Sequence, residues 1–322
     1  MANMTTGTDN LDAQFQTYFS KELLEYITKS LQLVQFANKT PLPARAGAKD
    51  VKWFRYDEPS TSAIATLTEG NTSITERALT LEEVTATLVQ YGQVISLTDI
   101  LQLTELFNHM EQSVRITGQD AALHADSIVR DKLAANFTGK QTRAANELAD
   151  WDAVEAAAAS AAVVEFNDLL DCATQLRTNN TSTIGGSYIA VAAPEVISDL
   201  MKTTGWQNAA SYSDVEALYK GEAGKLWGNR ILSTTNPFRS AVEYTYNSGG
   251  TVFSTFVFGA NAFGVTDIAS QSPYGPKVMI ADGPDKSDPL AQLTKVSYKS
   301  YYAAAVLQPK YCVEMYSKTA FA

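Results

Sequence analysis

The chain has 322 residues, enough for about two domains with cores of their own, and its 45% hydrophobic and 19% charged residues exclude a disordered protein. Its 25 basic and 35 acidic residues give a formal net charge of -10, so most of its surface repels phosphate and anionic lipid. This charge disfavours sequence-wide binding to nucleic acid or to a membrane.

The first 97 residues predict an arm and a hairpin. Apolar residues recur every three or four positions from Asp12 to Ala37, which predicts a helix, and the proline-flanked segment that follows predicts one strand at 51–56. Nine Ser or Thr residues in 60–80, with Gly70 and Asn71 at the middle, indicate a hairpin. Its return limb, 84–97, is rich in β-branched residues and predicts one long strand. A two-stranded ribbon is marginally stable alone, so we expect it to rest on another element.

A long helix follows the hairpin. At Ser96 the apolar period changes from two to 3.6 residues, and Ser96 with Asp99 has the spacing of a capping box. The pattern continues to about Asn136, which predicts one helix of about 38 residues, about 57 Å long, along an elongated body. Its apolar face consists of Ile100, Leu103, Phe107, Met110, Val114, Ala121, Ala125 and Ile128.

The rest of the chain predicts shorter elements of both kinds, and therefore an α+β fold with a second, mixed domain. Helices are expected at 151–162 and 166–176 and from Pro194 onward. Strands are expected at 188–192, 231–234, 251–258 and 263–268. Two final apolar runs, 293–307 and 310–317, are separated by Pro309. We expect these runs to pair with each other and to return to the domain of the long helix.

The residue types that most often perform catalysis or hold a metal are scarce. The two cysteines, Cys172 and Cys312, and the two histidines, His109 and His124, do not have the spacing of a metal site. The segment Gly221-Glu-Ala-Gly-Lys225 resembles a phosphate-binding loop, but it lacks that loop's first glycine and the Ser or Thr after the lysine. We expect no catalytic, cofactor or metal site, and two reduced cysteines.

Charge is segregated between the arm and the hairpin. Residues 39–56 contain five basic residues and one acid, whereas residues 57–83 contain six acids and one arginine. Either the two segments dock on each other in neighbouring copies of the chain, or each is solvated independently.

Four segments, in this order, also resemble a known family. They are Thr66-Leu-Thr-Glu-Gly70, Gln90-Tyr-Gly-Gln-Val-Ile-Ser-Leu-Thr-Asp99, Gly221-Glu-Ala-Gly-Lys-Leu-Trp-Gly-Asn-Arg230 with Thr234-Thr-Asn236, and Asp288-Pro-Leu290. With these segments, the chain resembles tailed-bacteriophage major capsid proteins of the HK97-like (Hong Kong 97) fold, in the coliphage N-four branch.

The resemblance implies an N-terminal arm at 1–59, an extended β-hairpin loop at 60–97, a peripheral domain with a long spine helix at 98–184 and 294–322, and an axial domain at 185–293. It implies a structural protein, not an enzyme, that self-assembles as pentamers and hexamers into the icosahedral head of the virion in the host bacterial cytoplasm. The implied partners are other copies of the chain, a portal, a separate scaffolding or decoration protein, and double-stranded DNA enclosed without sequence-specific binding. Neither a cofactor nor a membrane is implied.

Residues of the arm and loop are the candidates for contacts between subunits. They are basic residues of the arm and apolar, charged and turn residues of the loop: Arg45, Lys49, Lys52, Ile64, Leu67, Glu69, Gly70, Ile74 and Arg77. Some members of the family join subunits through a lysine of this loop, but no lysine lies between Lys52 and Lys132, so we expect a shell without such links. Two alternative functions remain: an encapsulin-type compartment shell, and a cytosolic enzyme with a ligand site in the mixed domain.

Overall fold

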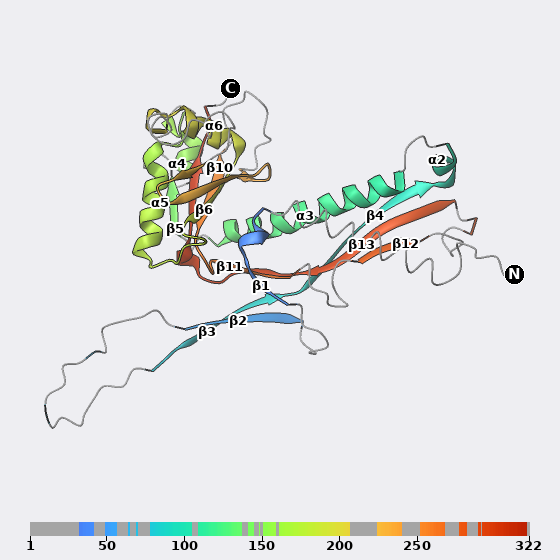
Figure 1. The fold of residues 1–322 in the computed structure, drawn as a ribbon, viewed down its shortest axis with the longest axis horizontal. Coiled ribbons are helices and arrows are strands. Elements are labelled where there is room, and N and C mark those ends of the chain that lie inside the picture. The colour runs from blue at the N-terminus through green and yellow to red at the C-terminus, as the bar shows by residue number, and fades with distance from the viewer. Residues whose placement is uncertain are drawn as a thin grey trace.

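The computed structural model describes residues 32–41, 49–56, 64, 69, 78–104, 109–136, 141–144, 148, 151–158, 161–206, 224–239, 252–267, 277–281, 289–290 and 292–320. These residues form a long body, built from one helix and three strands, and a compact body around a larger sheet (Figure 1). A two-stranded ribbon lies beside the junction of the two bodies and runs away from the long body (Figure 1).

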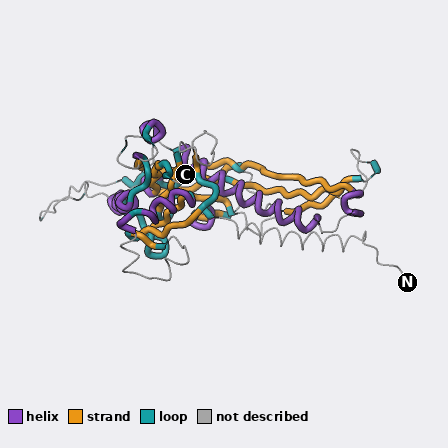
Figure 2. The backbone as a smooth tube through the Cα atoms, turned by 90° about the horizontal axis from the view of Figure 1, so that it is seen from above, coloured by secondary structure: helices purple, strands orange, loops and turns teal. Residues whose placement is uncertain are grey.

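The long body consists of helix α3 (His109–Ala135) on one face of a three-stranded antiparallel sheet, as Figure 2 shows from above. The sheet has the order β12 (Lys277–Ala281), β13 (Leu293–Tyr302), β4 (Val89–Thr98). The helix face that packs on the sheet is made of buried, mostly small residues: Val114, Ala121, Ala122, Ala125, Val129 and Leu133. Val296, Tyr298 and Tyr302 of β13 belong to the same apolar cluster.

The predicted start of the long helix at Ser96 is wrong. Strand β4 continues through Thr98, because its backbone pairs with β13 as far as Leu293. Thr98 Oγ1 then accepts the backbone N–H of Leu101 at 3.3 Å and caps a separate helix, α2 (Asp99–Thr104). The structure thus has two helices in place of the predicted one, and α3, with 27 residues, is about 40 Å long. Ile100 and Leu103, predicted to be buried, are 69% and 87% exposed.

The compact body is built on a seven-stranded mixed sheet covered by short helices. The strands are β5 (Gln141–Ala144), β15 (Cys312–Ser317), β10 (Phe253–Phe258), β6 (Tyr188–Ala192), β8 (Asn229–Ser233) and β7 (Lys225–Leu226) in spatial order, with β9 (Phe238–Arg239) also beside β10. The helices are α4 (Trp151–Ala156), α5 (Phe166–Thr178) and α6 (Pro194–Lys202). An apolar cluster from α5, α6, β6, β10 and β15 forms the core of this body. The predicted strand at 188–192, the helix at 166–176 and the helix start at Pro194 are confirmed.

The predicted pairing of the two final apolar runs is wrong. The first run forms β13 and β14 (Ala304–Val306), and the second forms β15 after a 3-10 turn at Pro309–Tyr311. β13 pairs with β4 and β12, β14 pairs with β11 (Phe263–Thr266), and β15 pairs with β5 and β10. Only the first run therefore returns to the long helix, whereas the second completes the compact body.

The ribbon joins a strand of the predicted arm to a strand of the predicted hairpin. β2 (Asp50–Tyr56), which confirms the predicted strand, pairs antiparallel with β3 (Leu81–Thr87). The return limb is therefore two strands, β3 and β4, with different partners. Glu69 lies in a turn, whereas Gly70 and Asn71 fall outside the described residues.

A third sheet holds the described end of the arm against the bodies. β1 (Asn38–Thr40) pairs with β11, which in turn pairs with β14. Val34–Phe36 forms a 3-10 turn, so the predicted first helix does not continue to Ala37; its part up to residue 31 lies outside the described residues.

Candidate functional site

Within one chain, the ribbon pairs basic residues of the predicted arm with acidic residues of the predicted extended loop. Lys52 Nζ lies 2.5 Å from Glu83 Oε1, and Arg55 pairs with Glu82 across the two strands. Exposed pairs of this kind contribute about 0–1 kcal/mol each. Four of the charges that suggested docking between copies, two bases and two acids, are therefore paired inside the subunit, an arrangement that neither sequence-based alternative included.

The structure places four of the nine predicted contact residues. Lys49, Ile64 and Glu69 are exposed, and Lys52 is in the ion pair with Glu83. The other five, Arg45, Leu67, Gly70, Ile74 and Arg77, lie outside the described residues. Contacts of all nine with neighbouring copies stay a prediction.

The base of the ribbon is fixed to its own subunit by Trp53 and Arg55. Trp53 Nε1 donates to Thr40 Oγ1 at 2.8 Å, and the indole lies so close to Gly264 that a Cβ there would be 2.9 Å from the ring. Arg55 Nη1 donates to the carbonyl oxygen of Leu307 at 2.7 Å. Trp53 is only 9% exposed, so this end of the ribbon is part of the folded subunit.

The other side of the ribbon presents apolar side chains to solvent. Because side chains alternate along a strand, Phe54 and Tyr56 point away from the face that holds Trp53. They are 60% and 70% exposed, and Leu81, opposite Tyr56, is 51% exposed. A contiguous exposed apolar surface of this kind is typical of an interaction site.

The described end of the arm is anchored to α3 by one carboxylate. The backbone N–H of Gln32 donates to Asp126 Oδ2 at 2.6 Å, and that of Val34 donates to Oδ1 at 3.2 Å. Asp126 is 5% exposed, and this burial raises the pKa of its carboxyl although the backbone hydrogen bonds oppose the shift. The sequence analysis missed this residue; the available signal was an acid on the buried face of the predicted helix.

Replacing Asp126 by Ala should release the arm, because the buried backbone N–H of Val34 and the partly buried one of Gln32 lose their acceptor. We expect the free energy of unfolding to fall by about 2 kcal/mol and amide exchange at residues 32–36 to accelerate. Asp120→Ala on the same helix is the control, since the Asp120 carboxylate accepts only an exposed hydrogen bond from Gln93. Equal exchange rates in the two variants would contradict the anchoring role.

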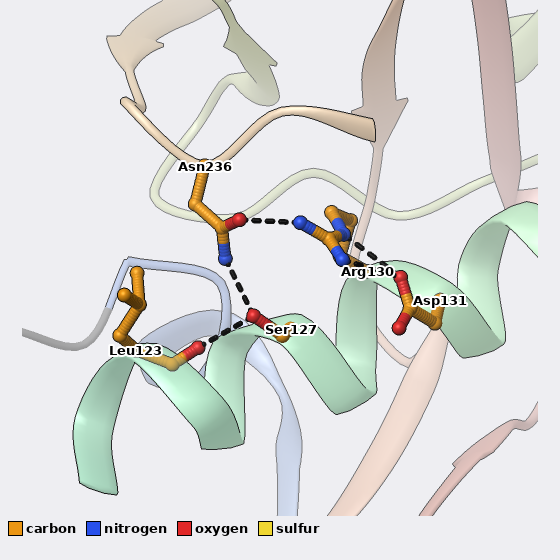
Figure 3. A network of polar contacts seen from close by, with 5 residues as sticks. All are labelled: Leu123, Ser127, Arg130, Asp131 and Asn236. Atoms are coloured by element: carbon orange, nitrogen blue, oxygen red, sulfur yellow. Dashed lines mark hydrogen bonds and ion pairs between the residues drawn. The ribbon is translucent and has the colours of Figure 1, made fainter. Parts of the chain in front are cut away.

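A polar network ties the compact body to α3 (Figure 3). Asn236, between β8 and β9, donates from Nδ2 to Ser127 Oγ at 2.8 Å and accepts a hydrogen bond from Arg130. Ser127 Oγ donates in turn to the carbonyl oxygen of Leu123 at 2.8 Å, and Arg130 Nε donates to Asp131 at 2.8 Å. Since Ser127 and Arg130 both belong to α3, the network fixes the loop at Asn236 on the helix.

Groups suited to metal binding or redox chemistry do not gather in the described part of the chain. No three His, Cys, Asp or Glu side chains come close enough there to hold a metal ion. Cys172 and Cys312 are both buried and free. Among the helices that the structure describes, none combines the length and apolar composition that crossing a membrane requires.

Comparison with known proteins identifies the fold. No family model and no curated protein sequence matches the chain. The capsid structure of the cyanophage P-SCSP1u matches with a TM-score of 0.63 and 15% identity, over 88% of this chain and 87% of that one. The acid-stable capsid structure of the Helicobacter pylori bacteriophage KHP30 matches with a TM-score of 0.65 and 10% identity, over 89% and 91%.

A virus-like particle is also similar to the chain. The virus-like particle from Pyrococcus furiosus matches with a TM-score of 0.54 and 12% identity, over 94% of this chain and 99% of that one. The chain thus has the fold of these shell proteins, and the predicted HK97-like α+β capsid fold is confirmed. The coliphage N-four branch stays a prediction.

Proposed function

We propose that the chain is a major capsid protein that self-assembles into the icosahedral head of a tailed bacteriophage. The observation that carries this proposal is the shared fold, which extends over almost nine-tenths of both chains in two phage capsids. Repetition of one subunit by symmetry builds closed shells from modest interfaces. A wall with a net charge of -10 also suits a container, because it does not adhere to packaged phosphate.

The exposed elements of the subunit support assembly. The ribbon carries exposed aromatic groups at Phe54 and Tyr56, and Ile64 and Leu79 of the adjoining loop are 77% and 74% exposed. A second copy of the chain is the partner that would cover them. The division into arm, extended loop, peripheral domain and axial domain belongs to this proposal, as do the portal, a scaffolding or decoration protein and enclosed double-stranded DNA.

A second candidate function is the shell of a protein-filled compartment of the encapsulin type. The particle from Pyrococcus furiosus favours it, because the match covers nearly all of both chains. Its TM-score of 0.54 is lower than the 0.63 and 0.65 of the phage capsids, so the phage head remains our first choice. We do not propose the enzyme alternative, because the shared fold is that of shell proteins.

Electron microscopy of the purified chain tests the proposal. We expect closed particles of uniform diameter when the chain is expressed in bacteria, alone or with the neighbouring phage genes. Particles from an infection should contain nuclease-protected DNA, whereas a compartment shell would contain protein cargo. A chain that remains monomeric under all of these conditions would contradict both shell functions.

A further inference from the structure

The hairpin of β7 and β8 ends in a turn that holds a tryptophan in an unusual backbone conformation. Leu226 pairs with Asn229, so only Trp227 and Gly228 lie between the two strands. Their φ angles are 53° and 82°, as in a type I′ turn. Glycine adopts such an angle without strain, and Asn or Gly usually fills the first position, whereas a bulky side chain there is strained. The local fold therefore does not explain why residue 227 is a tryptophan.

The indole of Trp227 is fixed in place and half-exposed. It is 45% exposed, and it meets the ring of Phe166 of α5 edge to face, with ring centres 5.6 Å apart. Phe166 packs in turn on the backbone of Gly205, where a Cβ would lie 2.6 Å from the Phe166 ring. An exposed tryptophan in a fixed position is typical of the centre of a protein interface.

Two arginines without an acidic partner lie at the same hairpin. Arg177 Nη2 donates to the carbonyl oxygen of Trp227 at 3.4 Å, and Arg230 of β8 is exposed. Among the described residues, neither arginine has a carboxylate at ion-pair distance, and the segment 225–233 contains no acid. We call this set the hairpin surface: Phe166, Arg177, Trp227 and Arg230. It is suited to a partner that combines acids with a flat apolar area.

Helix α4 has this composition. Asp152 and Glu155 are exposed one turn apart, and Ala156 beside them is exposed as well. Residues 144–165 contain five acids and no base. The nearest described base, Lys318, is 4% exposed and donates to two carbonyl oxygens at the end of the helix. The acids of α4 are therefore available to a positively charged partner, and the alanine leaves room for an indole.

The hairpin surface and α4 lie at opposite edges of the sheet. In the strand order of the compact body, β7 and β5 are the two end strands, five strand spacings or about 24 Å apart. Val154 of α4 packs on Tyr316 of β15, the strand beside β5. The sheet thus separates the two surfaces within one subunit, and they can meet only between two copies.

The charges also determine how two copies meet. Two hairpin surfaces that face each other would bring arginines against arginines, which is unfavourable. Contact between unlike surfaces joins copies head to tail, and head-to-tail contacts close into rings when the rotation between copies permits. A shell of repeated subunits can use such a contact.

We propose that Trp227 is the centre of a head-to-tail contact in which the hairpin surface of one copy binds α4 of the next. The indole lies on the exposed alanine of α4, and the two arginines face its two acids. This proposal rests on the proposed function, because it assigns a contact between subunits of one shell. It also accounts for a strained tryptophan in a turn that favours asparagine or glycine.

Paired cysteines test the contact in assembled particles. Thr174 is exposed on α5, between Phe166 and Arg177 along the helix, and Ala158 is exposed just after α4. A short bis-maleimide should link copies of the variant Thr174→Cys with Ala158→Cys into a ladder of dimers, trimers and larger species. The native Cys172 and Cys312 are buried and should not react.

The single-cysteine variants are the controls for this experiment. Either change alone should give no link, because the contact joins unlike surfaces. Dimers from Thr174→Cys alone would show that like surfaces meet. A double variant that stays monomeric, with or without a link inside one chain, would show that α4 of the next copy does not cover the hairpin surface. Each of these results would overturn the proposal.

Replacing the tryptophan separates assembly from stability. Trp227→Asn should change the melting temperature by no more than about 2 °C, because relief of the strained φ offsets the lost contact with Phe166. It should raise the subunit concentration needed for assembly by about 10- to 30-fold. Trp227→Tyr, which keeps an aromatic ring, should raise that concentration by no more than about 3-fold. Assembly of Trp227→Asn at the concentration of the unmodified chain would contradict the proposal.

Charge reversal supplies an independent test with a rescue. Arg177→Glu with Arg230→Glu should raise the concentration needed for assembly by about 3- to 10-fold at low salt, and less at high salt. Asp152→Arg with Glu155→Arg should have a similar effect, and the four changes together should restore assembly. Failure of the combined variant to improve on either pair would contradict the contact.

The matched control and the unmodified chain complete the design. Lys39→Glu with Lys132→Glu changes the net charge as much as the arginine pair does, at exposed positions outside the hairpin surface, and should assemble more readily than that pair. An equal loss in both pairs would show an effect of net charge alone and would contradict the contact. Absence of particles from the unmodified chain contradicts the proposed function as well, whereas particles without the cross-linked ladder contradict only the contact.

Discussion

A chain that lacks Thr66–Thr75 should fold like the full chain and form no particles. The paired strands β2 and β3 end at Tyr56 and Leu81, so the deletion removes none of their hydrogen bonds. The base of the ribbon also remains fixed by Trp53 and Arg55. Far-UV circular dichroism and gel filtration should report a native subunit, and electron microscopy should show no shells.

A variant with a loop of unchanged length distinguishes the effect of losing the side chains from the effect of shortening the loop. Replacing residues 66–75 by ten Gly and Ser residues keeps the loop length but removes Leu67, Glu69 and Ile74. We expect this variant to fail in assembly as well. Shells of normal size from either variant would show that the loop is not an assembly element.

Trp53→Ala should have the largest effect on stability among single changes in the ribbon. The indole is buried against Gly264 and Leu307, and its loss leaves a cavity and an unpaired hydroxyl at Thr40. We expect the free energy of unfolding to fall by about 3 kcal/mol and amide exchange in β2 and β3 to accelerate. Urea unfolding and hydrogen exchange measure the two effects.

The neighbouring aromatic residue is a matched control. Phe54 lies on the same strand but is 60% exposed, so Phe54→Ala should change the free energy of unfolding by no more than about 0.5 kcal/mol. Gly264→Val disturbs the same contact from the side of β11, because a Cβ at this position would lie 2.9 Å from the indole. Equal stability of Trp53→Ala and Phe54→Ala would contradict the anchoring of the ribbon.

Elements with strong local signals were predictable from the sequence. Strand β6 is buried along its whole length, and its apolar run from Tyr188 to Ala192 is bounded by Gly186 and Pro194. Helix α5 ends at Thr178 and is followed by Asn179 and Asn180, and Asn180 has the positive φ of 52° that such a turn favours. In these cases local sequence and tertiary structure agree.

The errors arose where distant segments decide the local structure. Ser96 and Asp99 have a capping spacing, but ten residue pairs between β4 and β13 keep Ser96 in a strand. The two final runs have similar strand periodicity, which does not reveal that they enter different sheets. Backbone pairing between segments about 200 residues apart has no local signature.

The residue types of the candidate site could be predicted from the sequence, but the contacts between those residues could not. The opposite charges of arm and loop are visible in the sequence, whereas the register of β2 and β3 determines that Lys52 and Arg55 meet Glu83 and Glu82 within the chain. The contact of Trp53 with Gly264 depends on the third sheet, which no periodicity predicts.

Strand β15 can join its sheet only late in the synthesis of the chain. This strand lies between β5 and β10, although it follows both of them along the chain, and its partner Gln141 precedes Val313 by 172 positions. At about 5–20 residues per second, β5 leaves the ribosome about 10–30 s before β15. Until then, among the strands that the structure describes, β5 has no partner in the sheet and one edge of β10 is open, so the compact body cannot close before β15 is made. The fold therefore delays a completely folded subunit until its synthesis has passed β15.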